Sequence, residues 1–238
     1  MIFRSAFILG STSEIAEKIC LELALRGCKK YHLASRNVEK NKSLIKKLNN
    51  LKVYDITTEE IELDMSYKNA NIEGSYDLYL VAIGYLGDNK KAENDLEEAK
   101  IIVETNFLNL LPWISQITQK GRIKEKGSLW IISSVAGDVG RPSNYFYGAS
   151  KAALTIFCEG LANYCYKYPF KVRIIKAGFI DTKMTKGRAP KILCANPSNL
   201  AKALLNKPNK SGIEYQPKWW RFVMFIVKRL PKKLISKL

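Results

Sequence analysis

A repeated alternation of short apolar runs with longer stretches of helical periodicity constrains this chain most. Strands are predicted over seven short runs: Ala6–Leu9, Tyr31–Ala34, Ile61–Leu63, Leu78–Ile83, Ser128–Ile132, Val172–Ile175 and Ile213–Tyr215. Helices are predicted over five longer stretches: Ser13–Leu25, Val38–Leu48, Leu96–Thr118, Phe146–Tyr166 and Pro197–Leu205. Units in which a helix follows a strand build a parallel sheet with helices on both faces. The pattern therefore predicts an α/β fold.

The length of the chain and the absence of an internal boundary indicate one domain. The 238 residues can bury one sizeable core, and they contain no internal repeat, linker or change of composition. We expect residues 1–216 to form this domain and residues 217–238 to add a basic, aromatic, helical tail to it. The segment Thr182–Ala195 lacks periodicity and should lie over the carboxyl ends of the strands, where ligands bind, either as a substrate lid or as an ordinary surface loop.

The cysteines and the hydropathy exclude several classes of protein. The five cysteines form no CxxC pair and His32 is the lone histidine, which argues against a disulfide framework and against a metal site. A reducing, cytoplasmic compartment fits best. No run approaches the ~20 apolar residues that cross a bilayer, and Met1–Leu9 lacks the pattern of a secretory signal. The chain is therefore not expected to span a membrane.

The net charge of +17 is concentrated near the end of the chain, where residues 202–238 hold ten Lys or Arg and one acid, Glu214. Within this region, Lys218–Leu238 combines tryptophans and other apolar residues with cations, which suits peripheral contact with an anionic membrane surface. A terminal helix that packs on the domain or on a second copy explains the apolar residues equally well. No RNA-binding motif accompanies the charge, so no nucleic-acid partner is expected.

The turn after the first predicted strand has features of a dinucleotide-binding site. Gly10 lets the chain turn sharply, and the small Ala16 lets the following helix pack closely on the sheet. The helix N-terminus then presents N–H groups and a positive dipole to a pyrophosphate. Only one of the three usual glycines is present, so this motif is weak on its own. The residues of this turn that we assign to the cofactor are Gly10, Thr12, Ser13, Glu14 and Ile15.

The end of the second predicted strand distinguishes the two nicotinamide cofactors. An acidic residue there would bind the ribose of NADH, and the chain has none. We assign Ser35, Arg36 and Asn37 to the cofactor, with Arg36 placed to pair with the 2′-phosphate of NADPH. NADPH is therefore favoured, with NADH as the alternative. Asp64 and Met65 are also assigned to the cofactor, with Asp64 meeting the adenine amino group, although a simple strand-end cap is the other interpretation of Asp64.

Tyr147 and Lys151 form the strongest chemical signal in the sequence. They lie four positions apart at the start of an apolar helix, which puts both on one helical face. A tyrosine titrates near ~10, and a neighbouring ammonium lowers that pKa because it stabilises the phenolate. The hydroxyl can then give or take a proton near neutral pH. Ser134, at the end of the fifth predicted strand, is placed to hydrogen-bond the same substrate oxygen.

With these motifs the sequence resembles the short-chain dehydrogenase/reductase family over nearly its whole length. The resemblance implies a Rossmann-type three-layer sandwich with a seven-stranded parallel sheet in the order 3-2-1-4-5-6-7. It implies that Tyr147 is the acid/base, that Lys151 lowers its pKa and holds the nicotinamide ribose, and that Ser134 positions the carbonyl. Asn106 matches the helix asparagine that supports a proton-relay water. The remaining cofactor residues implied by the family's segments are Ala82, Gly84, Gly178, Ile180 and Thr182.

The sequence departs from the family pattern at a few positions and resembles one subfamily more closely. Glu14 and Ala16 replace two glycines of the usual turn, and Ala177 replaces the usual proline. Residues 10–15, 82–88 and 221–231 resemble the decaprenylphosphoryl-2-keto-ribose reductases. This likeness implies reduction of a keto-sugar on a polyprenyl phosphate in cell-envelope polysaccharide synthesis, at the inner face of the cytoplasmic membrane. A flavin-dependent oxidase of the epimeric alcohol would act before it as a partner enzyme.

Other functions remain open at this point. The family is broad and a fold does not fix a substrate, so NAD(P)H-dependent reduction of a soluble carbonyl, such as a ketoacyl thioester or small ketone, is the alternative reaction. A basic nucleic-acid-binding protein is the alternative from another class. The family resemblance also implies a homodimer or homotetramer.

Overall fold

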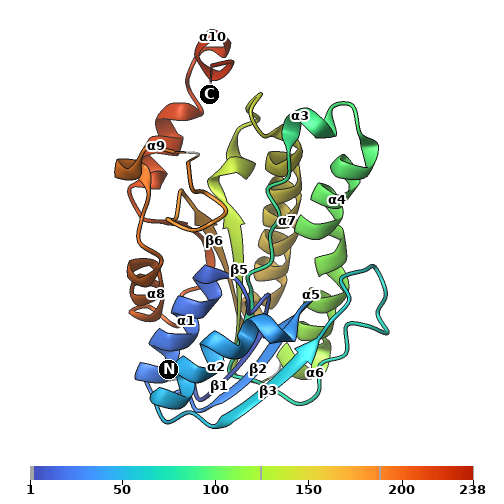
Figure 1. The fold of residues 1–238 in the computed structure, drawn as a ribbon, viewed down its shortest axis with the longest axis vertical. Helices are drawn as coiled ribbons and strands as arrows, with labels where there is room; N and C mark the ends of the chain where they lie inside the picture. The colour runs from blue at the N-terminus through green and yellow to red at the C-terminus, as the bar shows by residue number, and fades with distance from the viewer. Residues whose placement is uncertain (1–2, 124, 188, 238) are drawn as a thin grey trace.

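The computed structural model describes residues 3–123, 125–187 and 189–237. The described part leaves out residues 1, 2, 124, 188 and 238. These residues belong to the ranges assigned above to the domain, to the tail and to the loop over the sheet. The described chain forms three layers, with helices on both faces of a single sheet (Figure 1).

The central sheet has seven strands. In chain order they are β1 (Ser5–Leu9), β2 (Lys30–Ser35), β3 (Asp55–Glu60), β4 (Leu78–Val81), β5 (Ser128–Ser134), β6 (Lys171–Ala177) and β7 (Gly212–Gln216). Their spatial order is β3-β2-β1-β4-β5-β6-β7, and every neighbouring pair is parallel. The predicted Rossmann-type sandwich and its strand order are confirmed. All carboxyl ends of the strands therefore lie at one edge of the sheet.

Among the described residues, a helix follows each strand except β3, which is followed directly by β4. The helices are α1 (Glu14–Leu25), α2 (Lys42–Asn50), α3 (Asn89–Ala92), α4 (Leu96–Asn106), α5 (Leu111–Ile117), α6 (Lys120–Ile123), α7 (Tyr145–Tyr164), α8 (Pro197–Leu205), α9 (Trp220–Val227) and α10 (Lys232–Ile235). Ser13 caps α1 because its hydroxyl accepts a hydrogen bond from the backbone N–H of Ala16. Short 3₁₀ turns adjoin α2, α5 and α7 at Val38–Asn41, Leu108–Leu110 and Cys165–Lys167, and others lie in loops at Val135–Asp138 and Lys191–Leu193.

Two apolar cores fill the space between the sheet and its helical layers. Alternate side chains of a strand point to opposite faces of the sheet. In β1, Ala6 and Ile8 enter the core formed with α1, α2 and α8, whereas Phe7 and Leu9 enter the core formed with α5 and α7. All four side chains are fully buried. Burial on both faces explains why the central strands are continuous apolar runs in the sequence.

The third strand lies earlier in the chain than predicted. It is β3, which pairs with β2 from Asp55 to Glu60 at the edge of the sheet, and the prediction of a strand over Ile61–Leu63 is wrong. The side chains of β3 are exposed or half-buried and mostly polar, so this edge strand has no apolar run to reveal it. Ile61 and Leu63 follow the strand and line a cleft at its carboxyl end.

The predicted helix over Leu96–Thr118 is divided in the structure. α4 ends at Asn106, and Phe107 leaves the helical conformation with φ −142° and ψ −67°. α5 begins after a 3₁₀ turn and carries Pro112 in its first turn. Proline has no N–H to donate and clashes in a helix interior, so it favours a new helix start at this point. The break matters for function because it places Asn106 at a helix end.

The C-terminal helix α9 packs one face on the domain. Trp220 and Met224 are buried against Val135, in the turn that follows β5, and Phe179 meets the Trp220 ring edge-on with 5.5 Å between ring centroids. Figure 1 shows α10 extending beyond the body of the molecule. Among the residues that the structure describes, no helix is both long and apolar enough to cross a membrane.

A buried carboxylate fastens this helix to the same turn. Asp138 accepts a hydrogen bond from Tyr215 Oη at 2.6 Å and one from Lys176, and Lys228 of the segment after α9 lies 3.3 Å from its Oδ2. These cations hold the pKa of Asp138 below its usual value against the opposing effect of burial. The C-terminal segment is thereby tied to the loop that begins at Ser134.

Candidate active site

Two adjoining cavities lie at the carboxyl ends of the strands. The first, of about 390 Å³, is called here the catalytic cavity because Ser134, Tyr147 and Lys151 line it. The second, of about 350 Å³, is called the cofactor cleft and extends along the start of α1 to the end of β2. The two share a boundary of residues that line both: Ser13, Ile15, Ala82, Ile83, Gly84, Thr182 and Met184. A ligand can therefore occupy both at once.

The cofactor cleft contains most of the residues predicted to bind a dinucleotide. Those that line it are Gly10, Thr12, Ser13, Glu14, Ile15, Ser35, Arg36, Asn37, Ala82, Gly84 and Thr182. Gly10 has a φ of +87°, and a Cβ at this position would lie 2.8 Å from Ile83 Cγ1, so only glycine fits the turn. The cleft also meets the N-terminus of α1, where backbone N–H groups and the helix dipole favour a pyrophosphate. These residues fit a nicotinamide dinucleotide.

Buried hydrogen bonds hold the two turns of the cofactor cleft together. The Ser11 hydroxyl lies 2.9 Å from Asn41 Oδ1, and Asn41 Nδ2 donates to Ser35 Oγ at 3.1 Å. All three residues are buried. Sequence reasoning missed Ser11 and Asn41, because no local pattern shows that polar residues thirty positions apart meet under the cleft.

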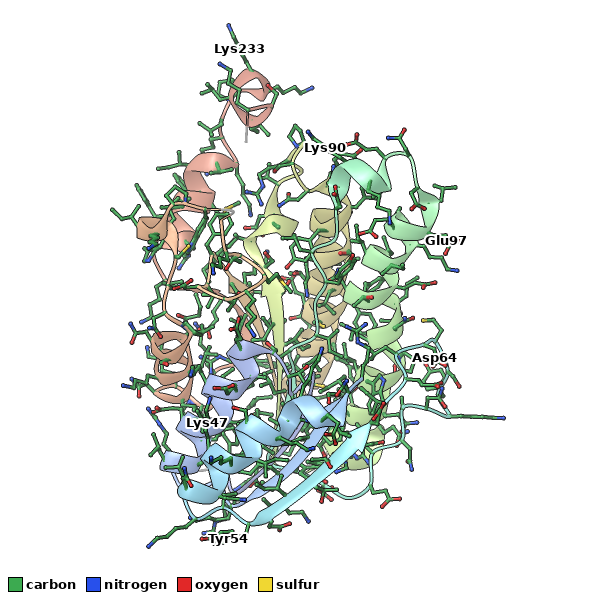
Figure 2. All side chains as sticks on the ribbon, viewed as in Figure 1. Lys47, Tyr54, Asp64, Lys90, Glu97 and Lys233 are labelled. Carbon is green, nitrogen blue, oxygen red and sulfur yellow. The ribbon has the colours of Figure 1, made fainter. Side chains whose placement is uncertain are left out.

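The adenosine end of the cleft differs in part from expectation. Lys40 lines it together with Arg36, so a second cation, which the sequence analysis did not identify, lies near the predicted site of the 2′-phosphate. Asp64 and Met65 do not line either cavity. The Asp64 carboxylate instead accepts hydrogen bonds from the Ser66 N–H at 2.9 Å and Asn69 Nδ2 at 2.7 Å. Figure 2 shows Asp64 at the outer edge of the molecule.

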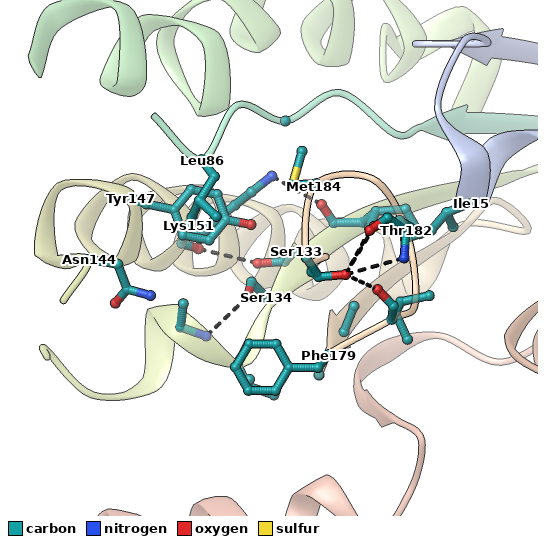
Figure 3. A pocket seen from close by; sticks show the side chains of 18 of the residues that line it. Ile15, Leu86, Ser133, Ser134, Asn144, Tyr147, Lys151, Phe179, Thr182 and Met184 are labelled. Atoms are coloured by element: carbon teal, nitrogen blue, oxygen red, sulfur yellow. Dashed lines mark hydrogen bonds between the residues drawn. The ribbon is translucent and has the colours of Figure 1, made fainter. Parts of the chain in front are cut away.

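Tyr147 and Lys151 lie on the same face of α7, as predicted. Lys151 Nζ is 5.9 Å from the centroid of the Tyr147 ring. The ammonium donates hydrogen bonds to the carbonyl oxygens of Ile83 and Ile132, each at 3.3 Å, and its side chain is almost completely buried. Figure 3 shows both side chains, with Ser134, turned toward the same space. The carbonyls thus fix the ammonium between the tyrosine and the cofactor cleft.

The protonation of the pair differs from the sequence-based expectation. Burial raises the pKa of Tyr147 to about 12, against the opposing effects of a hydrogen bond from Ser134 and of the Arg141 charge. Burial also lowers the pKa of Lys151 to about 8. The expected net lowering of the tyrosine pKa is not found, because desolvation outweighs the Ser134 hydrogen bond and the Arg141 charge. Tyr147 is therefore a phenol that carries its proton, ready to donate it.

Ser134 and Asn106 support the pair from two sides. Ser134 ends β5, and its hydroxyl accepts a hydrogen bond from the Ala136 N–H at 3.1 Å as well as bonding Tyr147. Asn106, fully buried at the end of α4, donates from Nδ2 to the Tyr85 and Ile102 carbonyls at 2.6 and 2.8 Å. Its Oδ1 accepts from the Tyr85 N–H. Asn106 therefore fixes the chain next to Lys151, and its part in a proton-relay water stays a prediction.

The segment after β6 closes the catalytic cavity. Gly178, Ile180 and Thr182 line this cavity, as assigned from the resemblance. A Cβ at Gly178 would overlap the indole of Trp220, so this position must be glycine for α9 to pack. The Lys183 N–H donates to Glu14 Oε2 at 2.6 Å, which joins the start of the loop Thr182–Ala195 to the first turn of α1. The loop thus begins directly over both cavities.

Several further lining residues of the catalytic cavity were not assigned from the sequence, and three of them could contact a substrate. They are Arg141, Asn144 and Phe179, which lie in the loop after β5 and in the segment after β6. No motif marks them, because substrate-facing loops differ in sequence where the catalytic residues are shared. The cavity therefore combines a polar catalytic end with residues whose role depends on the substrate.

Comparison with known proteins agrees with this geometry. The family described as short chain dehydrogenase matches residues 4–192. An uncharacterized oxidoreductase of Mycobacterium tuberculosis is 32% identical over 157 residues, which make up 66% of this chain and 63% of that protein. An uncharacterized oxidoreductase of Streptomyces coelicolor is 28% identical over 99% of this chain and 96% of its own. The 3-oxoacyl-[acyl-carrier-protein] reductase of Salmonella typhimurium is 28% identical over 76% of this chain and 75% of its own.

Solved structures share the fold. A 7beta-hydroxysteroid dehydrogenase superposes with a TM-score of 0.81 at 18% identity, over 95% of this chain and 92% of its own. A short chain dehydrogenase from Shigella flexneri, complexed with NADP, superposes with a TM-score of 0.77 at 20% identity, over 89% of this chain and 95% of its own. The family match covers most of the sequence, and the tyrosine, lysine and serine meet beside the cofactor cleft. This chain therefore belongs to the short-chain dehydrogenase/reductase family.

Proposed function

We propose that this protein uses NADPH to reduce a keto group of a sugar carried on a polyprenyl phosphate. The observation that carries the reductase chemistry is the meeting of Ser134, Tyr147 and Lys151 in a cavity that opens into the cofactor cleft. Bound NADPH supplies a hydride to the keto carbon. Tyr147 donates its proton to the keto oxygen, and the Ser134 hydroxyl holds that oxygen in place. Lys151 holds the nicotinamide ribose and stabilises the phenolate that remains.

Two cations support NADPH over NADH. Arg36 and Lys40 both line the adenosine end of the cofactor cleft and are exposed to a ligand there. An arginine and a lysine favour a phosphate dianion over a neutral ribose hydroxyl. A protein that oxidises NADH faster than NADPH at equal concentrations would contradict this preference.

The lipid-linked substrate is supported by the position of α9. Trp220 of this helix packs against Gly178 and Phe179, which line the catalytic cavity. The opposite side of α9 exposes Phe222 and Phe225 to solvent. A helix that meets the active site on one side and displays apolar residues between cations on the other suits an enzyme whose substrate carries a lipid. A flavin-dependent oxidase that forms the ketone from the epimeric alcohol is the partner proposed with it.

Reduction of a soluble carbonyl, such as a ketoacyl thioester, is the second candidate. It is supported by the similarity to the 3-oxoacyl-[acyl-carrier-protein] reductase of Salmonella typhimurium. Rates of NADPH oxidation with a polyprenyl-phosphate keto-sugar and with an acetoacetyl thioester distinguish the two candidates. For either substrate we propose a homodimer or homotetramer as the working assembly.

The substitution Tyr147→Phe tests the chemistry. It removes the hydroxyl that donates the proton but keeps the ring, so turnover should fall at least about a hundredfold. NADPH binding, followed by the change in cofactor fluorescence, should stay close to that of the wild type. Tyr145→Phe is the matched control, since Tyr145 is exposed on the same helix and does not line the cavity. Full turnover by Tyr147→Phe would exclude the mechanism.

A further inference from the structure

The catalytic cavity is lined by a cation, Arg141, whose charged group has no protein partner in the described part of the chain. Among the described residues, the buried cations have partners: Arg173 lies 2.6 Å from Glu214, Lys176 is bonded to Asp138, and Lys151 donates to two backbone carbonyl oxygens. Arg141 lines the catalytic cavity and is partly buried, yet within the described residues its guanidinium forms no ion pair or hydrogen bond. An unpaired charge in a partly buried position costs free energy, so proteins keep one mainly where it acts on a ligand.

The rest of the cavity has no acid that would compensate this charge. Among the described lining residues there is no Asp or Glu, whereas Arg141 and Lys151 are both cationic. Burial lowers the pKa of Arg141. An anion that binds beside Arg141 is attracted by its positive charge and is not repelled by a lining carboxylate. The same charge acts on the Tyr147 hydroxyl, so it lies near the atom that donates the proton.

A second polar group in the same wall also lacks a partner. Asn144 lines the cavity three residues after Arg141, and its Oδ1 is buried with no hydrogen-bond partner among the described residues. Buried side-chain oxygens are nearly always hydrogen-bonded. A ligand hydroxyl that donates to Oδ1 would satisfy this atom. Figure 3 shows Asn144 and Tyr147 on the same side of the cavity.

We propose that Arg141 and Asn144 form an anion subsite in the catalytic cavity. It takes a phosphate group that the substrate carries close to its keto carbon, while Asn144 accepts a hydrogen bond from a neighbouring hydroxyl. The inference rests on the proposed keto-reductase function and specifies which substrates it favours: keto-sugar phosphates over neutral ketones. Arg141 binds the phosphate through charge-assisted hydrogen bonds. Leu86, Phe179 and Met184 supply an apolar surface for the remaining part of the substrate.

A binding experiment tests the subsite without requiring turnover. The full-length protein saturated with NADP⁺ is titrated by calorimetry with dihydroxyacetone phosphate and with dihydroxyacetone, which differ only in the phosphate. We expect the wild type to bind the phosphate at least about tenfold more tightly. Arg141→Met should remove that preference, Arg141→Lys should keep part of it, and Asn144→Leu should weaken both ligands. Arg4→Met, an exposed arginine just before β1, is the control and should bind like the wild type.

The outcomes separate this inference from the proposed function. A wild type without preference for the phosphate, or an Arg141→Met variant that retains the preference, would overturn the subsite. Hydroxypyruvate, which carries a carboxylate instead, distinguishes the two anions: binding as tight as that of the phosphate would overturn the assignment to phosphate. NADP⁺ binding by each variant shows that it is folded. Tyr147→Phe should lose turnover and keep the phosphate preference, so a failure of the chemistry leaves the binding result readable.

Discussion

Lys151 is a cation held in an apolar surrounding, and its titration should set the pH range of the reaction. Burial lowers its pKa to about 8, whereas Tyr147, with a pKa raised to about 12, keeps its proton throughout. A lysine is charged below its pKa, so the ammonium is present below pH 8 and lost above it. We expect kcat/KM for reduction to be level at lower pH and to fall about tenfold per pH unit above about pH 8.

The substitution Lys151→Arg provides the control for this pH profile. An arginine stays charged over the whole accessible range, so the decline above about pH 8 should disappear even if the rate is lower. The measurement is the rate of NADPH oxidation at limiting substrate from about pH 6 to about pH 10. A decline that persists in Lys151→Arg would assign the titration to another group.

At the residue scale, the sequence predicted which residues form the active site but not the pKa of each group. The spacing of Tyr147 and Lys151 follows from helical periodicity, so their shared face was predictable. Their pKa values depend on burial among residues distant in the sequence, such as Ile83 and Ile132, whose carbonyls bond Lys151, and no local pattern reveals this burial. Lys40 and Arg141 escaped the sequence analysis for the same reason, since a lysine or arginine in a loop is ordinary until its surroundings are known.

At the scale of elements, α9 depends on a single glycine for its place against the active site. Gly178→Ala puts a methyl group into the indole of Trp220 and should force the helix away from the catalytic cavity. Overpacking of this kind costs about 1–3 kcal/mol. We expect a lower unfolding temperature and a raised KM for the keto substrate. Thermal unfolding and steady-state kinetics measure the two effects.

Gly140→Ala is the matched control for that substitution. Gly140 lies near the same cavity in the loop after β5, and a Cβ there would meet no heavy atom within 4 Å. Its unfolding temperature and KM should stay near those of the wild type. If both alanine variants behave alike, the position of Trp220 does not depend on Gly178.

Strands and helices could be predicted where burial requires a run or periodic pattern of apolar residues. β1, β4, β5 and β6 are covered on both faces, and their apolar runs identified them within a few residues. β3 is an exposed edge strand with a polar sequence, so periodicity could not find it. The division of the helix at Phe107 was missed although Pro112 signals a helix start, because apolar periodicity continues across the break.

At the scale of the whole molecule, the C-terminal segment combines exposed apolar side chains with many cations. Residues 217–238 contain no acid. Phe222, Phe225 and Ile226 of α9 are exposed.

The cations of the same segment extend to the end of the chain, and Figure 2 shows Lys233 projecting from α10 at the end of the molecule. The cations of this segment are Lys218, Arg221, Lys228, Arg229, Lys232, Lys233 and Lys237. Aromatic residues among cations are typical of segments that bind the headgroup region of anionic lipids. Here the exposed phenylalanines lie on α9, the helix that packs beside the active site.

The proposed membrane contact is testable through these aromatic residues. The double variant Phe222→Glu and Phe225→Glu places two anions on the exposed face of α9 while Trp220 and Met224 stay packed on the domain. Its sedimentation with phosphatidylglycerol vesicles should fall at least about tenfold, because it loses apolar burial and gains repulsion from the headgroups. Leu96→Glu, which alters an exposed leucine on α4, should sediment like the wild type.

Binding of the wild type should weaken as salt increases, because salt screens the attraction between the cations and the lipid headgroups. Binding should also be lower on phosphatidylcholine, because this lipid carries no net charge. Equal binding of the double variant and the wild type would show that α9 does not enter the interface, and the lipid-linked substrate would then lose the structural support that α9 gives it.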